Sequence, residues 1–457
     1  MSNNNNTKNT QNKSFLIYAR CIILFLIICA QATKATATMP VKDWTVIVYM
    51  AADNDLKGFA AQNIKQMAEI GSNQYLNIVV ELHIRISGNQ KVTRRYFIEQ
   101  NKIFHVNADD PWSQKMDSGN PDTLVSCCQW ATTDYPANKY ALILWNHGTG
   151  PLDPSMGRII NPTELFTYNA TINKFELDRT TGFLEFVDLY NKIDRGVCWD
   201  DSTGNYLTNQ KLEAALKKIK NSCLNNNKLN IIGFDACLMA TIEIANLAKD
   251  YANILVGSQE VELGTGLNYQ RTLNIFQYGT TDEKSFAQNI VKEFGKTYQP
   301  ITNDYTHSAM DLSKIVQLET NINNVANLLM LCLDKQKNMS VYNAIRASQD
   351  RRVCTHFDEP TYKDLHHLYK NLQANLVNFS LTDKTEEITL KTQLNQAFDE
   401  GCALIKTIAF ANISGTNLKL AQGISIYLPE TRIHPSYPKT KFAATNQWIM
   451  FLNHYLS

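Results

Sequence analysis

Short apolar runs that end in polar clusters alternate along this chain with segments of helical periodicity. The runs are rich in Val, Ile and aromatic residues: WTVIVYMAADNDL (44–56), YALILWNHGTG (140–150), KLNIIGFD (228–235) and NILVGSQE (253–260). Helical patterns lie between and beyond them, as in 122–135, 206–220 and 236–251. Such alternation predicts an α/β fold with a mostly parallel central sheet covered by helices on both faces.

The chain has 457 residues and a formal net charge of +1. This length accommodates two or three domains or one enlarged α/β domain. A nearly neutral chain has no bulk charge field that would attract nucleic acid or acidic lipid, so we expect no nucleic-acid partner.

The first 37 residues have the pattern of a secretory signal peptide. A polar leader is followed by an apolar stretch, from about Cys21 to Ala30, and then by small and polar residues. Cleavage is expected after Ala32 or Ala37. An uncleaved anchor is the alternative, but the apolar run is shorter than the roughly 20 residues that span a bilayer. We therefore expect a secreted or periplasmic (extracytoplasmic) protein with no stable membrane insertion after cleavage.

Two polar clusters at predicted strand ends contain a pair of residues that can perform nucleophilic catalysis. Cys237 follows the strand 228–235, and His147 follows the strand that ends near Trp145. A helix that begins at Cys237 would favour the thiolate through its free N–H groups and dipole. A histidine at a neighbouring strand end can act as general acid and base. The alternatives are a buried structural cysteine and a histidine that caps a loop.

Six sequence blocks resemble, in order, the clostripain family of cysteine peptidases, which is related to caspases, legumains and gingipains. They are WTVIVYMAADNDL, ALILWNHGTG, VCWDDSTGNYLT, IIGFDACLMA, VGSQE and QGISIYLPE, and they span residues 44–430. The resemblance implies a caspase-like three-layer α/β/α sandwich and endopeptidase activity on protein or peptide substrates. It places the catalytic dyad on His147 and Cys237, with no third member identified. The oxyanion donors expected with this dyad are the backbone N–H groups of Gly148 and Cys237.

The resemblance also predicts residues of the substrate pocket. It places Asp235 in the S1 pocket, where the family selects Arg or Lys at P1, although Asp235 can instead be the N-cap of the next helix. A second acid is expected in the segment ELGTGLNY (262–269), where this chain has Thr265. Basic specificity is therefore weaker or different, unless Glu260 or Glu262 replaces the missing acid.

The expected organisation is a catalytic core at 40–310, a C-terminal helical and β region at 311–457, and a strand at 423–428 that joins the core. Residues 151–195 resemble an insertion, either a surface loop or an excised segment. Because relatives cleave themselves between the catalytic His and Cys, we expect autoprocessing here. The candidate cut points are Arg158, Lys174, Arg179, Lys192 and Arg195.

No cofactor is required for thiol chemistry. Calcium is a minor expectation, with Asp200 and Asp201 as oxygen ligands. Two other functions remain alternatives: a catalytically inactive binding or scaffold protein, and a peptide ligase of the same fold. A serine hydrolase is not expected, because no G-x-S-x-G motif is present.

Overall fold

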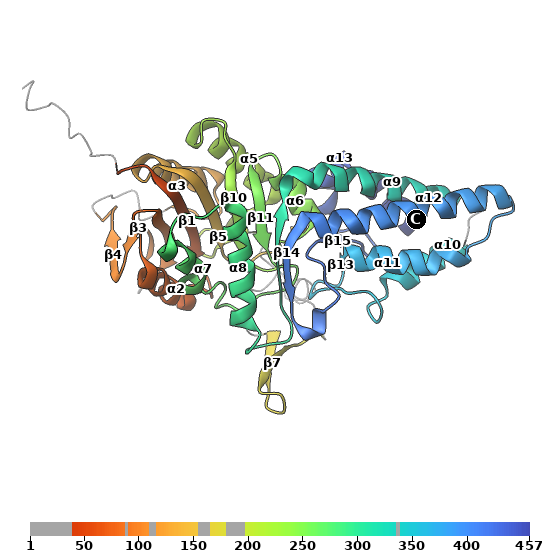
Figure 1. Cartoon of the computed structure of the whole chain (residues 1–457), viewed down its shortest axis with the longest axis horizontal. Helices are drawn as coiled ribbons and strands as arrows, with labels where there is room; N and C mark the ends of the chain where they lie inside the picture. The colour runs from red at the N-terminus through yellow and green to blue at the C-terminus, as the bar shows by residue number, and fades with distance from the viewer. Residues whose placement is uncertain (1–38, 87–89, 109–115, 154–164, 180–196, 335–338) are drawn as a thin grey trace, which may run out of the picture. The chain divides into compact units, whose positions relative to one another are not determined.

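The computed structural model describes residues 39–86, 90–108, 116–153, 165–179, 197–334 and 339–457. Residues 41–457 form one compact unit around a nine-stranded sheet (Figure 1). The predicted signal peptide, its cleavage sites and Arg158, Lys192 and Arg195 lie outside the described residues.

The sheet is parallel at its centre and antiparallel at both edges. Its strands are β1 (Lys42–Ala52), β2 (Leu76–Arg85), β3 (Lys91–Glu99), β4 (Lys102–His105), β5 (Ala137–Trp145), β10 (Leu229–Asp235), β11 (Ala252–Gly257), β12 (Thr306–Asp311) and β14 (Ala409–Ser414). Their spatial order is β14-β12-β11-β10-β5-β1-β2-β3-β4. The five strands from β11 to β2 are parallel to one another. These strands are almost completely buried, as their continuous apolar sequences predict.

Helices pack on both faces of the sheet, which gives three layers (Figure 1). One face carries α2 (Lys57–Ile70), α7 (Tyr269–Leu273) and α8 (Glu283–Tyr298), and the other α3 (Pro121–Asp134), α5 (Asn209–Lys218) and α6 (Ile242–Ala248). Polar caps define where several begin: Asn120, Thr208 and Asp282 each accept a hydrogen bond from a first-turn N–H. The predicted α/β/α fold class is confirmed.

The C-terminal region is mainly helical. Its helices are α9 (Ile315–Asp334), α10 (Met339–Gln349), α11 (Leu365–Asn375), α12 (Lys384–Ile408), α13 (Lys441–Thr445) and α14 (Trp448–Leu456). Single turns of 3₁₀ helix occur at Asn274–Tyr278, Leu312–Lys314, Leu376–Asn378, Thr416–Leu418 and Tyr437–Lys439, and a π turn at Ile219–Cys223. Residues 402–408 are the last turns of α12.

One strand of this region, β14, extends the main sheet beside β12. The strand expected at 423–428 contains β15 (Ser425–Tyr427), which pairs with β13 (Tyr362–Asp364) in a two-stranded sheet and not with the nine-stranded sheet. It contacts the core through the backbone instead, because the N–H of Ser425 donates to the Ala240 carbonyl at 3.0 Å.

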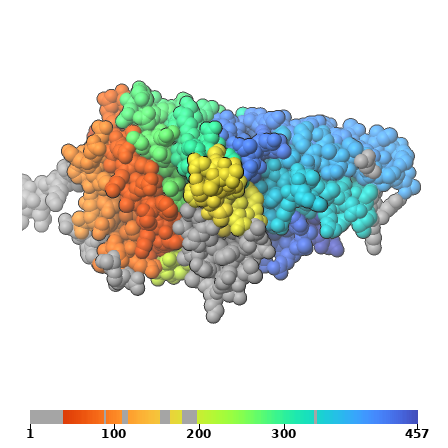
Figure 2. Space-filling view, turned by 90° about the horizontal axis from the view of Figure 1, so that it is seen from below, coloured from red at the N-terminus to blue at the C-terminus, as the bar shows by residue number. Residues whose placement is uncertain are grey.

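Part of the predicted insertion is regular structure. Strands β6 (Phe166–Asn169) and β7 (Lys174–Leu177) form a hairpin, and β8 (Val197–Asp200) pairs with β9 (Asn205–Leu207) just beyond the insertion. In Figure 2 the hairpin, in yellow, lies against the green and cyan segments of the compact unit.

The eight cysteines beyond the leader are all free thiols in the described chain. Among the described residues, no helix has the length and hydropathy needed to cross a bilayer.

Candidate active site

The site lies at the carboxyl ends of three adjacent parallel strands. Because β5 pairs with β1 on one side and with β10 on the other, the loops that follow these strands meet at one edge of the sheet. They carry Asp55 after β1, His147 after β5 and Cys237 after β10. The two predicted catalytic residues are therefore on neighbouring loops.

His147 is completely buried and is held by a carboxylate that the sequence analysis did not assign. Its Nε2 lies 2.7 Å from Oδ1 of Asp55. A carboxylate can only accept, so the imidazole donates from Nε2 and carries its lone pair on Nδ1. Nδ1 has no hydrogen-bond partner among the described residues. The imidazole is thus oriented, with its basic nitrogen free to accept a proton.

Cys237 lies in a loop and not in the first turn of a helix. Helix α6 begins at Ile242, and its N-cap is Thr241, whose hydroxyl accepts from the N–H of Ile244. The expectation that a helix dipole stabilises the Cys237 thiolate is therefore wrong. Asp235 does not cap this helix either, which removes the structural alternative for that residue.

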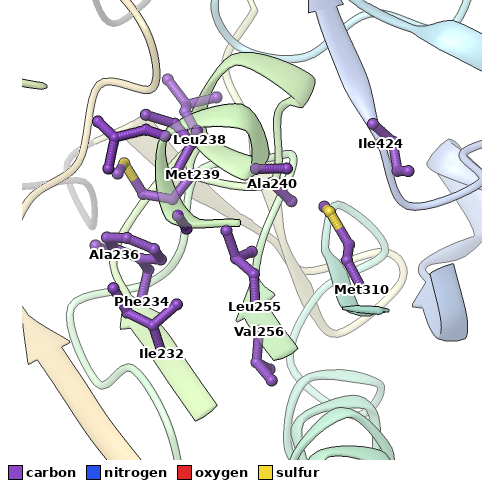
Figure 3. Packing of buried hydrophobic residues seen from close by; sticks show 14 of the residues in the cluster. Ile232, Phe234, Ala236, Leu238, Met239, Ala240, Leu255, Val256, Met310 and Ile424 are labelled. Carbon is purple, nitrogen blue, oxygen red and sulfur yellow. The ribbon is translucent and has the colours of Figure 1, made fainter. Parts of the chain in front are cut away.

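Residues 258–262 hold the loop that carries Cys237. The N–H groups of Leu238 and Ala240 donate to the carbonyls of Glu260 and Ser258, at 3.2 and 2.8 Å. In the opposite direction, the N–H of Glu262 donates to Sγ of Cys237 at 3.2 Å. Apolar side chains of the loop, among them Leu238 and Met239, pack against β10 and β11 (Figure 3).

Leu238 shows that this loop is held in an unusual conformation. Its φ angle is +64°, a region that a leucine rarely adopts. Such conformations persist where surrounding contacts impose them, and they gather at functional sites. The contacts to residues 258–262 therefore determine the backbone geometry directly after Cys237.

Gly148 brings the His147 loop against the Cys237 loop. A Cβ atom at this position would lie 2.3 Å from the carbonyl oxygen of Cys237, so only glycine fits. No hydrogen bond from the N–H of Gly148 or of Cys237 is recorded within the described chain. Within the described residues, these two N–H groups, which are the predicted oxyanion donors, remain available to a ligand.

The thiol is closed off from solvent. Cys237 is 2% exposed. Burial raises the pKa of the thiol well above its usual value, although the N–H of Glu262 opposes this. The adjoining cavity measures about 20 Å³, which is room for about one water molecule. The site is therefore in a closed form, in which the thiol is protonated.

Two carboxyl groups line this small cavity. Asp235 accepts from the N–H of Leu267 at 2.9 Å and from the hydroxyl of Tyr269 at 2.8 Å. Glu262 is 3% exposed and lies beside Asp235. Its Oε1 is 3.8 Å from Nε2 of His307, but burial lowers the pKa of His307 to about 3, so this imidazole is neutral. Burial raises the pKa of Asp235 to about 6. Burial, and after it the nearby charge of Asp235, raise the pKa of Glu262 well above its usual value. The cavity is an acidic pocket that lacks a cation.

Thr265 is not among the residues that line this cavity, whereas its neighbours Gly264 and Gly266 are. Gly266 has a φ angle of +56°, and a Cβ there would lie 2.3 Å from Oδ1 of Asp235. The segment therefore closes directly over Asp235. Glu262, which the sequence analysis named as a substitute acid, occupies the pocket, while Glu260 is bound elsewhere.

The two residues considered for calcium are both occupied. Asp200 accepts from the N–H groups of Ser118 and Thr203 and is paired with the ammonium group of Lys91. Asp201 accepts from the indole N–H of Trp199. The ammonium group of Lys91 already neutralises Asp200, which is what a bound calcium ion would have to do. Asp200 and Asp201 therefore do not fit a calcium site. Groups of three or more metal-ligating side chains are absent from the described residues.

A three-layer α/β/α fold with a cysteine and an oriented histidine at adjacent strand ends is that of caspase-like cysteine peptidases. The family model described as the clostripain family matches residues 48–174 and 183–454. The chain belongs to this family, and it is a cysteine endopeptidase.

Individual relatives agree with this assignment. Clostripain from Hathewaya histolytica is 24% identical over 453 residues, which cover 87% of this chain and 77% of that protein. A secreted C11 cysteine protease from Bacteroides thetaiotaomicron, solved with an irreversible peptide inhibitor, has a TM-score of 0.57 at 18% identity, covering 90% of this chain and 99% of its own. An inactive zymogen C11 protease from Parabacteroides distasonis has a TM-score of 0.56 at 17% identity, covering 91% and 99%.

Proposed function

We propose that Cys237 is the nucleophile of this endopeptidase and that His147 is its general acid and base. The observation that carries the proposal is the free Nδ1 of an imidazole oriented by Asp55, on the loop that packs against Cys237. Asp55 acts as a positioning residue, because it holds the imidazole in the tautomer that can accept the thiol proton.

The reaction then follows from these groups. The thiol proton moves to Nδ1 of His147 as Sγ attacks the peptide carbonyl. The N–H groups of Gly148 and Cys237 donate to the oxyanion. When the C–N bond breaks, the imidazolium gives its proton to the leaving amine and a thioester remains. Water, deprotonated by His147, hydrolyses the thioester and restores the thiol.

The closed pocket requires a movement before this reaction. A substrate side chain cannot enter a space of about 20 Å³, so the segment 263–268 has to move away from Asp235. The same movement admits solvent to Cys237 and removes the burial that raises its thiol pKa. Substrate binding and thiol activation are therefore linked.

Substitution of the thiol tests the assignment. Cys237→Ala should abolish hydrolysis of a mixed peptide library and leave the fold intact, since only a sulfur atom is lost. The matched control is Cys223→Ala, because Cys223 is the half-buried thiol and the more accessible of the two. Hydrolysis at the wild-type rate by pure Cys237→Ala protein would contradict the proposal.

The P1 preference that this pocket favours is Arg or Lys. The support is the pair of buried carboxyl groups of Asp235 and Glu262, which lack a cation in a cavity beside the nucleophile. A bound guanidinium or ammonium group would stabilise their ionised forms, and the forked guanidinium can contact both. Selectivity for a basic P1 residue then depends on Asp235 and Glu262. The sequence alone pointed to Asp235 together with the residue at position 265, which is Thr265.

Export and self-processing complete the proposal. The signal-peptide pattern of residues 1–37 predicts secretion, and sequencing the N-terminus of mature protein locates the cut at Ala32 or Ala37. Intact-mass analysis tests for a cut within 151–195. Addition of EGTA tests for calcium dependence, which the ion pair of Asp200 and Lys91 disfavours.

Two alternative functions have direct tests. A scaffold protein would not react with a peptide probe that alkylates an active thiol, whereas a peptidase would. A ligase would transfer the acyl group from Cys237 to an added amine in preference to water, and product analysis distinguishes the two outcomes.

A further inference from the structure

The hairpin of β6 and β7 is firmly docked on the compact unit although it belongs to the predicted insertion. The N–H of Phe175 donates to the Ile301 carbonyl at 2.8 Å, and the ammonium group of Lys174 donates to Asn303 at 2.7 Å. Backbone N–H bonding continues to the end of the hairpin, where Leu177 donates to the carboxylate of Asp304 at 3.3 Å. The hairpin is therefore integrated into the fold and does not behave as a loose loop.

Arg179, two residues after the hairpin, forms an ion pair with a completely buried carboxylate. Its Nη2 lies 2.7 Å from Oε2 of Glu260 and 3.3 Å from Oδ1 of Asp304. Glu260 is 0% exposed, and its other oxygen accepts from the N–H groups of Val261 and Asp358. Burial raises the pKa of Glu260, and the charge of Arg179 opposes that rise. Removal of the guanidinium would leave a buried carboxylate without its counter-ion, which is strongly unfavourable.

Glu260 is also the residue that holds the backbone after the nucleophile. Its carbonyl accepts from the N–H of Leu238, the residue with positive φ that follows Cys237. It stands between Ser258, which binds Ala240, and Glu262, which binds Sγ. The N–H of Leu238 belongs to the peptide unit that follows Cys237, so a shift of Glu260 would move that unit and, with it, the Cα atom of Cys237.

We propose that Arg179 is a positioning residue for the reaction proposed above. By neutralising Glu260 it holds residues 258–262 in place. The contact from Glu260 to the N–H of Leu238 then fixes the Cα atom of Cys237, and this atom sets the position of the Cys237 N–H that donates to the oxyanion. The inference rests on the proposed function. It assigns to the insertion between His147 and Cys237 a part in building the site.

The ion pair bears on self-cleavage as well. The guanidinium of Arg179 is engaged by Glu260 and Asp304, and the ammonium group of Lys174 by Asn303. Neither side chain is available to enter an S1 pocket in this arrangement. Cleavage after Arg179 or Lys174 is therefore disfavoured, and the docked hairpin should remain with the mature enzyme.

The test separates oxyanion stabilisation from thiol reactivity. Alkylation of Cys237 by iodoacetamide forms no oxyanion, whereas hydrolysis of a peptide amide does. For Arg179→Gln we expect kcat on a peptide amide cleaved by the wild type to fall about tenfold to a hundredfold, the value of a charge-assisted hydrogen bond. KM should stay within about twofold of wild type, and the alkylation rate should fall less than kcat, because the thiol is touched only through the N–H of Glu262.

Two variants serve as controls. Lys174→Gln, on the same hairpin, should keep kcat within about twofold, because it breaks a contact that does not reach Glu260. The double variant Arg179→Gln with Glu260→Gln removes the unpaired charge, so it should recover part of the lost kcat, and it remains usable if Arg179→Gln alone fails to fold.

The outcomes are distinct. Wild-type kcat in Arg179→Gln, or an equal loss of kcat and alkylation rate, would overturn the positioning role while leaving the proposed function intact. No recovery in the double variant would overturn it too. If the wild-type protein shows no hydrolysis that depends on Cys237, the proposed function is refuted, and the inference with it.

Discussion

Replacement of Asp55 by Asn tests whether this carboxylate sets the tautomer of His147. The structure places Oδ1 of Asp55 2.7 Å from Nε2, with the carboxylate side chain 26% exposed and the imidazole fully buried. A hydrogen bond to a charged group contributes roughly 1.5–3 kcal/mol. At about 1.4 kcal/mol for each factor of ten, its loss corresponds to a decrease in kcat/KM of about tenfold to 150-fold.

The comparison of two substitutions sharpens the test. An Asn amide can turn its NH₂ group towards Nε2, which favours the tautomer with hydrogen on Nδ1. That nitrogen could then no longer accept the thiol proton. Asp55→Asn should therefore lose more activity than Asp55→Ala, where the imidazole is only left without a partner.

The assay is kcat/KM on a fluorogenic peptide at pH 7, together with ¹⁵N NMR of the His147 ring to identify the protonated nitrogen. Asp122→Asn is the matched control, because Asp122 is an exposed carboxylate paired with Lys218. If Asp55→Asn retains activity within about twofold of wild type, Asp55 does not position the imidazole, and the tautomer argument is refuted.

Two further predictions concern buried carboxyl groups. Glu262→Gln should lower kcat/KM for Arg at P1 relative to a neutral P1 by about tenfold to a hundredfold, while Thr265→Val, outside the cavity, should leave this ratio unchanged; equal ratios in wild type and Glu262→Gln would remove Glu262 from the pocket. Burial raises the pKa of Glu243 from 4.5 to about 7, so the folded state binds the proton more tightly and stability is lost as pH rises from about 4.5 to about 7. Glu243→Gln resembles the protonated acid, so the decrease in the free energy of unfolding between pH 4 and pH 8, measured in urea, should be smaller by roughly 3 kcal/mol. An unchanged pH dependence would contradict the raised pKa of Glu243.

The sheet and the positions of its central residues could be predicted because they depend on local pattern. Apolar runs such as 140–145 and 229–234 are strands that are buried on both faces, and the sequence shows this directly. Polar residues at their ends then indicated where His147 and Cys237 lie. The confirmed family assignment rests on the same blocks.

The parts that could not be predicted depend on contacts between distant segments. The sequence from Ala236 to Thr241 is typical of a helix, but the N–H groups of Leu238 and Ala240 bond to residues 260 and 258, and no local signal reports this. Asp55 was within the noted polar cluster AADND, yet its role depends on β1 and β5 being neighbours. If the pairing of β1 with β5 had been known, Asp55 could have been predicted to lie beside His147.

Strand order also determines when the site can exist during synthesis. The central strands β1 and β5 pair Lys42 with Ala137, so they join segments about 95 residues apart. Strand β10 pairs with β5 after another long connection, as Ile231 lies opposite Ala141. Closing such distant contacts is slow compared with forming helices and hairpins. Residues 258–262, which hold the nucleophile's loop, are synthesised later still. A ribosome-bound chain that ends before them carries both His147 and Cys237 but lacks the segment that holds the nucleophile's loop, so the site cannot be complete at that stage.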